Sequence, residues 1–196
     1  MARKQQEKSL QTQHELLDSA EKLFGSRGFV ATTIAEITAD AGYAKGNFYR
    51  YWQSKDDIMF EIIANKMQSY RQVRDTALSS ASSLTEVMDH ILDFLETMID
   101  DRNWSTVFLE FTIHASRDPE LRARLNQSIY RLSDEIFEDI VAPHITSNYA
   151  ACKIGALNTA LFEGFLVHSL LGTGTIDRAD FRRAAMKLAL ANATDA

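Results

Sequence analysis

Lys45, Asn47 and Tyr49 are the residues whose types and spacing best suit a chemical role. They lie beside Phe48 and Trp52, which are four residues apart and therefore share one face of a short helix. With that apolar face turned inward, the helix presents an ammonium, an amide and a phenol on its outer side. Such groups can hydrogen-bond to base edges in the major groove of DNA. The alternative is a helical hairpin with a solvated polar face, because helix-turn-helix patterns are loose.

The chain around these residues predicts a helix-turn-helix, two short helices joined by a tight turn, within residues 32–55. Thr32 or Thr33 can cap the first helix, because a hydroxyl there accepts hydrogen bonds from the free N–H groups of the first turn. Gly42 falls where the chain must leave that helix, and glycine adopts a positive φ at little cost. The second helix is expected over residues 44–51.

Two further helices should brace this motif. The first is expected over residues 11–26, where apolar side chains recur at helical spacing and form one buried stripe. Residues 1–10 carry basic side chains and almost no apolar anchor, so we expect a flexible arm that reaches phosphates or the minor groove, or else a disordered end. Ser54 should cap a fourth helix over residues 55–78, which is long enough to join the motif to the rest of the chain.

The residues that carry a family pattern between positions 16 and 58 are Ala20, Phe24, Gly28, Phe29, Thr32, Thr33, Ile34, Ile37, Ala41, Gly42, Phe48, Tyr49, Lys55 and Ile58. In this order and without gaps, the segment resembles the N-terminal DNA-binding domain of TetR/AcrR-type repressors. Ala44 stands where many members carry serine or another capping residue, which weakens the cap of the second helix by about 1 kcal/mol. It also removes a hydroxyl that would contact a base or a phosphate. Trp52 replaces the more usual phenylalanine.

The resemblance implies that the second helix reads DNA. The three polar residues of its outer side would meet bases or adjacent phosphates. Thr33, Tyr51 and Lys55 would clamp the DNA backbone, and Lys55 is part of the family match. The predicted DNA-binding residues are Thr32, Thr33, Ala44, Lys45, Gly46, Asn47, Tyr49, Tyr51 and Lys55.

The distribution of charge supports a division of labour along the chain. The formal net charge is −6, which by itself argues against binding nucleic acid. Residues 1–55, however, hold 8 lysines and arginines and 6 acidic residues, whereas residues 56–196 hold 13 and 21. A mildly basic head on an acidic body is typical of a small DNA-reading unit attached to a separate regulatory domain. Chance variation in a short segment is the alternative explanation.

Composition predicts an all-α fold. The chain has 2 prolines and 8 glycines among 196 residues, with 45% hydrophobic residues, so long helices are expected. We expect an N-terminal three-helix, helix-turn-helix DNA-binding domain over residues 1–54. A C-terminal helical ligand-binding and dimerisation domain should follow over residues 55–196, beginning with the linking helix.

The body should contain five more helices after a polar break at residues 79–83. In the family that the chain resembles, the last two helices pair with their twofold mates as a four-helix bundle, which implies a homodimer. Packing of these two helices inside one chain is the alternative. The expected helices cover residues 84–101, 104–116, 118–143, 149–171 and 181–190.

Aromatic side chains lie on body helices that should meet at the centre. Such stripes are usually plain core, but the resemblance implies an effector pocket in this domain. Polar groups on the same helices could orient a bound molecule. The predicted effector-binding residues are Phe94, Met98, Trp104, Phe108, Phe111, Thr112, Phe137, Asn158, Phe162 and Phe165.

The sequence does not predict an enzyme. It contains no GxSxG, Walker, GxGxxG or HExxH motif, and its 5 histidines are scattered. Glu110 and His114 lie four apart and could share a metal ion, but a hydrogen-bonded helical pair is commoner, so neither a metal nor a cofactor is predicted. The single Cys152 cannot form an internal disulfide and fits a reducing, cytoplasmic setting. Neither a targeting signal nor a membrane-spanning apolar run is apparent.

Together these observations predict a homodimeric transcriptional regulator, a repressor that a small-molecule effector releases from a palindromic double-stranded DNA operator. One alternative is a helical small-molecule- or protein-binding module without sequence-specific DNA binding. Another is an enzyme hidden in the helical body. Activation or co-repression in place of derepression is a third.

Overall fold

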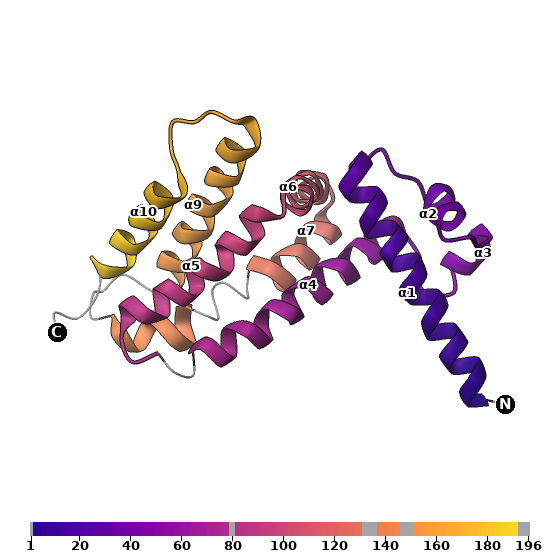
Figure 1. Ribbon diagram of the computed structural model, residues 1–196, viewed down its shortest axis with the longest axis horizontal. Helices are drawn as coiled ribbons and strands as arrows, with labels where there is room; N and C mark the ends of the chain where they lie inside the picture. Colours follow the sequence, from indigo (N-terminus) through magenta and orange to yellow (C-terminus); the bar gives the residue numbers. More distant parts are fainter. Residues whose placement is uncertain (1, 79–80, 131–136, 146–150, 192–196) are drawn as a thin grey trace.

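Two groups of helices form the molecule, and a long helix, α4 (Lys55–Leu78), runs from one group to the other (Figure 1). The structure is a computed structural model that describes residues 2–78, 81–130, 137–145 and 151–191. Its regular elements within these ranges are all helices, so the predicted all-α fold is confirmed. We call α1 to α3, together with the turns that follow α3, the head (residues 2–54), and α5 to α10 (residues 84–190) the body.

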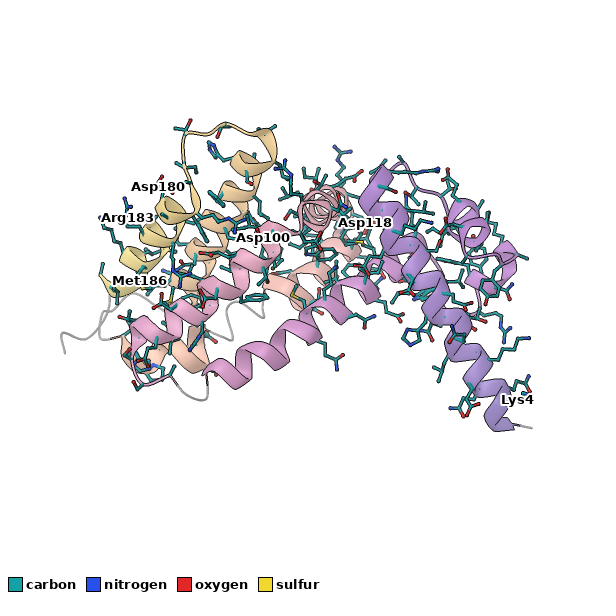
Figure 2. The ribbon with its side chains drawn as sticks, in the orientation of Figure 1. Lys4, Asp100, Asp118, Asp180, Arg183 and Met186 are labelled. Carbon is teal, nitrogen blue, oxygen red and sulfur yellow. The ribbon has the colours of Figure 1, made fainter. Side chains whose placement is uncertain are left out.

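The first helix, α1 (Ala2–Arg27), is longer than predicted. The expectation of a flexible arm at residues 1–10 is wrong for the residues that the structure describes. Residues 3–8 are largely good helix formers without glycine or proline. This part of α1 is also anchored, because the Tyr51 hydroxyl donates a 2.9 Å hydrogen bond to the Ser9 carbonyl. Lys4 marks the exposed N-terminal end of this helix, on the far side of the head from the body (Figure 2).

The first helix of the predicted helix-turn-helix is α2 (Ile34–Asp40). Thr33 caps it in a capping box, in which the Thr33 hydroxyl accepts from the Glu36 N–H and the Glu36 carboxylate accepts from the Thr33 N–H. Gly42 follows with φ +76°, so the predicted glycine turn is confirmed.

The second helix, α3 (Lys45–Phe48), is shorter than the predicted range of 44–51. It continues as turns rather than as α-helix through Tyr51. Two features of the sequence shorten it. Ala44 occupies the N-cap without a side-chain hydrogen bond, and Gly46 lowers the helix propensity of so short a segment.

The linking helix α4 begins and ends as predicted, at Lys55 and Leu78. Its N-terminus is capped in both directions. The Ser54 hydroxyl accepts from the Asp57 N–H at 3.1 Å, and the Asp57 carboxylate accepts from the Ser54 N–H at 3.1 Å. The predicted cap is therefore confirmed.

The body begins with α5 (Leu84–Asp100) and α6 (Arg102–Ser116). The Ser83 hydroxyl accepts from the Glu86 N–H and caps α5, as predicted. The Asp101 carboxylate accepts from the Trp104 N–H and caps α6, which therefore starts two residues before the expected position.

The predicted helix over residues 118–143 is not continuous. Asp118 and Pro119 do start α7 (Pro119–Leu125), with the carboxylate as cap and the proline in the first turn. The chain then forms π-helical segments, η1 (Asn126–Tyr130) and η2 (Phe137–Val141), and a 3-10 turn, η3 (Ala142–His144). The part of the prediction at residues 131–136 lies outside the described residues.

Two helices close the chain, α9 (Ala151–Leu171) and α10 (Arg178–Leu190). The expected start of α9 at residue 149 lies outside the described residues. Asp177, not Asp180, caps α10; Asp180 sits at the third helical position and completes the capping box. By length and composition alone α9 would qualify as a membrane span, but core helices meet the same test, and one side of α9 is buried in the body.

The largest buried cluster of apolar side chains runs from the head into the body. Phe29 links the two, since its ring packs against Phe24 of α1 at 5.2 Å and edge-on against Phe111 of α6 at 4.9 Å. A smaller cluster lies at the far end of the body, where η2 packs on α9. Phe137 approaches Gly155 so closely there that an added Cβ would lie 2.9 Å from the ring. The head therefore shares its core with α4 and α6.

Candidate DNA-binding surface and effector site

The two faces of the α3 segment differ as predicted. Phe48 is fully buried and Trp52 is 4% exposed, and their rings pack 5.3 Å apart. The Trp52 indole N–H donates to Glu61 of α4 at 2.6 Å, which fastens this face to the linking helix. Lys45 is exposed and Tyr49 is 51% exposed on the opposite side. The arrangement leaves the polar groups of the outer side accessible to the major groove of a DNA duplex.

The other predicted DNA-binding residues of α3 share this outer side to different degrees. Asn47 is half-buried, whereas Ala44 and Gly46 are exposed. An alanine and a glycine at these positions leave room for the backbone of α3 to approach another molecule closely.

Thr33 and Thr32 have different environments. Thr33 is exposed at the N-terminus of α2, where its hydroxyl belongs to the capping box. Thr32 is fully buried, and its hydroxyl donates to the Gly28 carbonyl at 2.8 Å and the Leu23 carbonyl at 3.3 Å. The side chain of Thr32 stabilises the loop between α1 and α2, so its place in the structure does not favour the predicted DNA contact.

Tyrosines fasten the reading motif to α1. Besides the hydrogen bond from Tyr51 to Ser9, the Tyr43 hydroxyl donates a very short hydrogen bond to the Glu15 carboxylate. This bond raises the pKa of Tyr43 and, together with a hydrogen bond from Gln11, lowers the pKa of Glu15. Tyr51 is therefore partly engaged within the head and is half-buried.

Lys55 is more embedded than its predicted role implies. Its ammonium donates to the carbonyls of Phe29 at 2.6 Å, Thr32 at 2.8 Å and Val30 at 3.2 Å, and it lies 4.4 Å from the centre of the Phe29 ring. Burial lowers the pKa of Lys55, although the carboxylates of Asp56 and Glu110 oppose this effect. A DNA phosphate would have to share the ammonium with these carbonyls.

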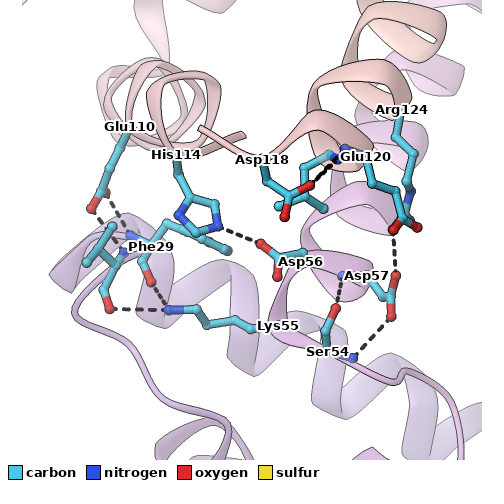
Figure 3. Close-up of polar contacts among 12 residues, drawn as sticks. Phe29, Ser54, Lys55, Asp56, Asp57, Glu110, His114, Asp118, Glu120 and Arg124 are labelled. Carbon is cyan, nitrogen blue, oxygen red and sulfur yellow. Dashed lines mark hydrogen bonds and ion pairs between the residues drawn. The ribbon is translucent and has the colours of Figure 1, made fainter. Parts of the chain in front are cut away.

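Glu110 and His114, the pair considered for a metal, reach separate partners, one in the loop after α1 and the other at the start of α4 (Figure 3). The Glu110 carboxylate accepts from the N–H groups of Phe29 at 2.8 Å and Val30 at 3.0 Å. The His114 Nε2 atom lies 2.9 Å from the Asp56 carboxylate. The sequence showed the helical spacing of the pair, but the partners are about sixty to eighty residues away in sequence, so this junction was not predicted.

A third contact joins α7 to the start of α4. The Arg124 guanidinium donates to Asp57 at 2.9 Å and lies 4.1 Å from the centre of the Phe60 ring. Burial acts to raise the pKa of Asp57, but hydrogen bonds from Arg124 and Ser54 outweigh it, and the pKa lies below its ordinary value.

The predicted effector residues do not form one group. One group is buried on α5 and α6 and consists of Met98, Trp104 and Phe108. A second group lies on α9, where Phe162 and Phe165 pack on Phe181 of α10. Phe94 is half-buried against the same core. Two residues lie elsewhere: Phe111 packs at the junction with the head, against Phe29 and Phe60, and Phe137 belongs to the smaller cluster beside Gly155.

Three buried polar atoms of the predicted effector residues have no hydrogen-bond partner among the described residues. They are Trp104 Nε1, Thr112 Oγ1 and Asn158 Oδ1. The Asn158 amide nitrogen donates to the Ile154 carbonyl at 3.0 Å, so one half of this side chain is satisfied. Unpaired buried polar groups are few in folded proteins and call for a specific explanation. A bound molecule that supplies the missing partners is one such explanation.

Cavities lie next to these helices. One of about 460 Å³ is lined by Thr112, Ser116 and Tyr130, among others, and another of about 270 Å³ shares Tyr130 and reaches Glu163 of α9. The Tyr130 hydroxyl donates to Glu163 at 2.5 Å. Burial and this carboxylate raise the pKa of Tyr130, while the nearby Thr112 hydroxyl opposes the rise without making a hydrogen bond of ordinary geometry. Sequence reasoning missed Tyr130, because its partner lies on another helix.

Comparison with known proteins matches both parts of this chain. Residues 16–62 match the model for bacterial regulatory proteins of the tetR family. Residues 84–192, more than half of the chain, match the model for the C-terminal part of BetI-type transcriptional repressors. The chain belongs to the TetR family. It is thus a TetR-family DNA-binding transcriptional regulator, and the resemblance seen in the sequence is confirmed.

Individual relatives are more distant. The regulator BetI of Brucella melitensis biotype 2 is 23% identical over 84% of this chain and 83% of its own length. HbdR of Aromatoleum sp. (strain CIB) is 29% identical over a segment that covers 48% of this chain and 41% of HbdR. The fold matches the fatty acid degradation regulator FadR from Bacillus halodurans with a TM-score of 0.74 at 16% identity, over 91% of this chain and 94% of FadR. TetR-family members are transcriptional regulators rather than enzymes, and they combine a DNA-binding head with a ligand-binding body.

Proposed function

We propose that this TetR-family protein is a homodimeric repressor that binds a palindromic DNA operator and leaves it when a small molecule binds in the body. The observation that carries the proposal is the two-sided build of the α3 segment. Phe48 and Trp52 hold it to the head, while Lys45 and Tyr49 face outward. A helix held in this way can enter a major groove without losing its own support.

The chemistry of α3 suits the reading of bases. The Asn47 amide can pair with adenine through two hydrogen bonds, and the Lys45 ammonium can meet guanine or a phosphate. Tyr49, Thr33 and Tyr51 would contact the DNA backbone around these bases. Ala44 and Gly46 would let the helix backbone come close to it.

The outer face of α9 and α10 supports a homodimer. Leu157 and Leu161 are 41% and 38% exposed, Leu171 is 74% exposed, and Leu190 of α10 is 40% exposed. Small residues on α9, such as Gly164, would allow a second helix to approach closely. Exposed apolar side chains on two helices that pack together are typical of a protein–protein interface, and these helices lie at the end of the body away from the head (Figure 1). A twofold axis there would present two heads to one operator.

The body supports an effector that combines an apolar frame with hydrogen-bonding groups. Aromatic rings supply the apolar walls, and Asn158 Oδ1, Thr112 Oγ1 and the Glu163 carboxylate supply polar contacts. Proteins of the same fold differ in their ligands. FadR from Bacillus subtilis was solved with stearoyl-CoA, and a regulator from Saccharomonospora viridis with choline. The effector of this protein must therefore be chosen by the side chains of its own body.

A DNA selection with the full chain tests the proposal. A random duplex pool should yield a palindromic site, and a gel shift at two salt concentrations should show weaker binding at higher salt, as phosphate contacts require. Asn47→Ala should relax the preference at one base position of each half-site, at a cost of about 1–3 kcal/mol. Gln127→Ala, which removes an exposed amide of the body, is the matched control. A failure to enrich any sequence would favour a binding module that does not read DNA.

Effector release is tested on the same complex. Stearoyl-CoA and choline, added separately to the protein bound to its selected DNA, are the first probes. Release would support derepression, whereas tighter DNA binding would make the added molecule a co-repressor.

A further inference from the structure

The loop between α1 and α2 is held from two sides by opposite charges. From the side of α4, the Lys55 ammonium donates hydrogen bonds to the carbonyls of Phe29, Val30 and Thr32. From the side of α6, the Glu110 carboxylate accepts hydrogen bonds from the N–H groups of Phe29 and Val30, one with each oxygen. Figure 3 shows hydrogen bonds of Lys55 and of Glu110 on the same short stretch of backbone. Hydrogen bonds that involve an ionised group are stronger than neutral ones.

Gly28 makes room for this arrangement. It has φ +87°, a conformation that favours glycine. An added Cβ at this position would lie 2.8 Å from Glu110 Oε2, the atom that accepts from the Phe29 N–H. A side chain on residue 28 would therefore displace the carboxylate from the loop.

Glu110 lies on α6 between residues of the body core and a residue that lines a cavity. Thr112, which lines the larger cavity, is two residues further along the same helix, and Phe108, in the body core, is two residues before it. The loop that Glu110 holds leads directly into Thr33, the N-cap of α2. A single side chain thus links the body to the loop that precedes α2, without passing through α4.

We infer that Glu110 is the positioning residue that sets the angle of the DNA-binding head on the body. It acts through the backbone of residues 28–30 rather than by touching DNA. In a dimer this angle sets the distance between the two copies of α3, and hence the spacing of the half-sites that can be bound together. The inference rests on the proposed function, and it adds the device that makes the spacing selective.

The first test reads the contact itself by hydrogen exchange of the full chain. A Gln at position 110 offers one acceptor oxygen and an NH₂ group, which faces the second backbone N–H as donor against donor. Glu110→Gln should speed the exchange of the Phe29 and Val30 amides by about tenfold or more. Thr106→Ala, an exposed site on α6 whose hydroxyl bonds only within its own helix as described, should leave both rates unchanged. Equal protection in wild type and Glu110→Gln would overturn the inference.

The second test reads the consequence for DNA. Half-sites selected by the wild type are joined with their natural spacing and with one base pair added or removed. The wild type should lose about tenfold or more in affinity when the spacing changes, whereas Glu110→Gln should lose about threefold or less. Binding to a single half-site should stay the same within about twofold, because the reading surface is intact. If the variant keeps the wild-type spacing preference, Glu110 does not position the head.

Gly28→Ala supplies an independent check. In the wild type it should mimic Glu110→Gln, because the new methyl group displaces the carboxylate. In a Glu110→Ala background the same substitution should add no further loss of spacing preference. Additive losses would contradict the inference. A wild-type protein that selects no paired half-sites would instead contradict the proposed function, and the exchange test would still stand.

Discussion

The head and the body differ in how completely their buried polar atoms are hydrogen-bonded. In the head, the hydroxyls of Ser19, Thr32 and Thr38 are buried and each donates to a backbone carbonyl. In the body, the buried Ser105 hydroxyl likewise donates to the Met98 carbonyl. Thr112 and Asn158, however, keep buried oxygen atoms without a hydrogen bond to any described residue. The two halves have the same kind of helices and similar side chains. They differ in whether every buried polar side-chain atom of the described residues has a hydrogen-bond partner within the protein.

This difference teaches how one chain can be both a rigid reader and an adaptable receptor. A satisfied network holds a single geometry, because any movement breaks hydrogen bonds that water cannot replace. Unsatisfied groups beside cavities leave free energy to be gained by a bound molecule. The head is therefore suited to present a fixed surface, and the body to change when it is occupied.

The largest effect is expected in the tight core of the head. Phe48→Ala removes a fully buried ring that packs on Trp52, so the free energy of unfolding should fall by about 3–5 kcal/mol. Denaturant unfolding followed by circular dichroism measures this. Tyr49→Ala, at an exposed neighbour, should change stability by about 0.5 kcal/mol or less while weakening DNA binding. Comparable losses for both variants would mean that the outer side of α3 is also needed for folding.

A matched pair of substitutions tests the contrast directly. Thr32→Val leaves a buried loop without its hydroxyl donor and should lower the free energy of unfolding by about 1–3 kcal/mol. Thr112→Val removes a hydroxyl that has no hydrogen-bond partner among the described residues, so it should be neutral within about 0.5 kcal/mol or slightly stabilising. Thermal unfolding of the two variants at one pH gives the comparison. A Thr112→Val loss as large as that of Thr32→Val would erase the difference between head and body.

The weakest point of the head offers a gain of stability. Ala44 caps α3 with extended backbone angles, φ −74° and ψ 148°, but without a side-chain hydrogen bond. Ala44→Ser can supply one and should raise the free energy of unfolding by about 0.5–1 kcal/mol. Ala31→Ser, at an exposed loop position outside the helix, should have no such effect. A shift in melting temperature for both variants alike would point to something other than capping.

The smallest effect concerns acid at the junction of head and body. The pKa of Asp57 is lowered in the folded protein, so its contribution to stability is present above the ordinary carboxyl pKa of 3.8 and is lost as the pH falls through the folded value. Asp57→Asn should therefore flatten the fall in melting temperature below about pH 4. Arg124→Ala should flatten it in the same direction by removing the partner. An unchanged acid limb in both variants would mean that the pair contributes nothing.

The sequence predicted the elements whose signals are local. Ser54, Ser83 and Asp118 were identified as caps from their own neighbourhoods, and the structure confirms all three. The buried face of α3 followed from the spacing of Phe48 and Trp52. Each of these signals depends on residues within one or two helical turns of each other, where spacing alone decides which side chains meet.

The rest depends on contacts that spacing cannot show. The N-terminal turns of α1 are ordered partly by Tyr51, which lies 42 residues away from Ser9. The π-helical segments after α7 have no sequence signature that we could use, and Phe137 joined the smaller cluster because Gly155 makes room for its ring. Glu110 had the right helical spacing to pair with His114, but Glu110 accepts from the loop after α1 and His114 contacts Asp56 of α4. Long-range partners decided each of these cases.

The two tryptophans give each half of the molecule an optical signal of its own. Trp52 sits in the head with its indole N–H bonded to a carboxylate, and Trp104 sits in the body beneath the Lys66 ammonium, 5.0 Å from its ring. Replacing either one by phenylalanine leaves a single emitter whose colour and quenching follow one half alone. DNA and effector can then each be titrated into a solution of the single-tryptophan variant. The fluorescence shows whether the head or the body responds first, without an attached dye.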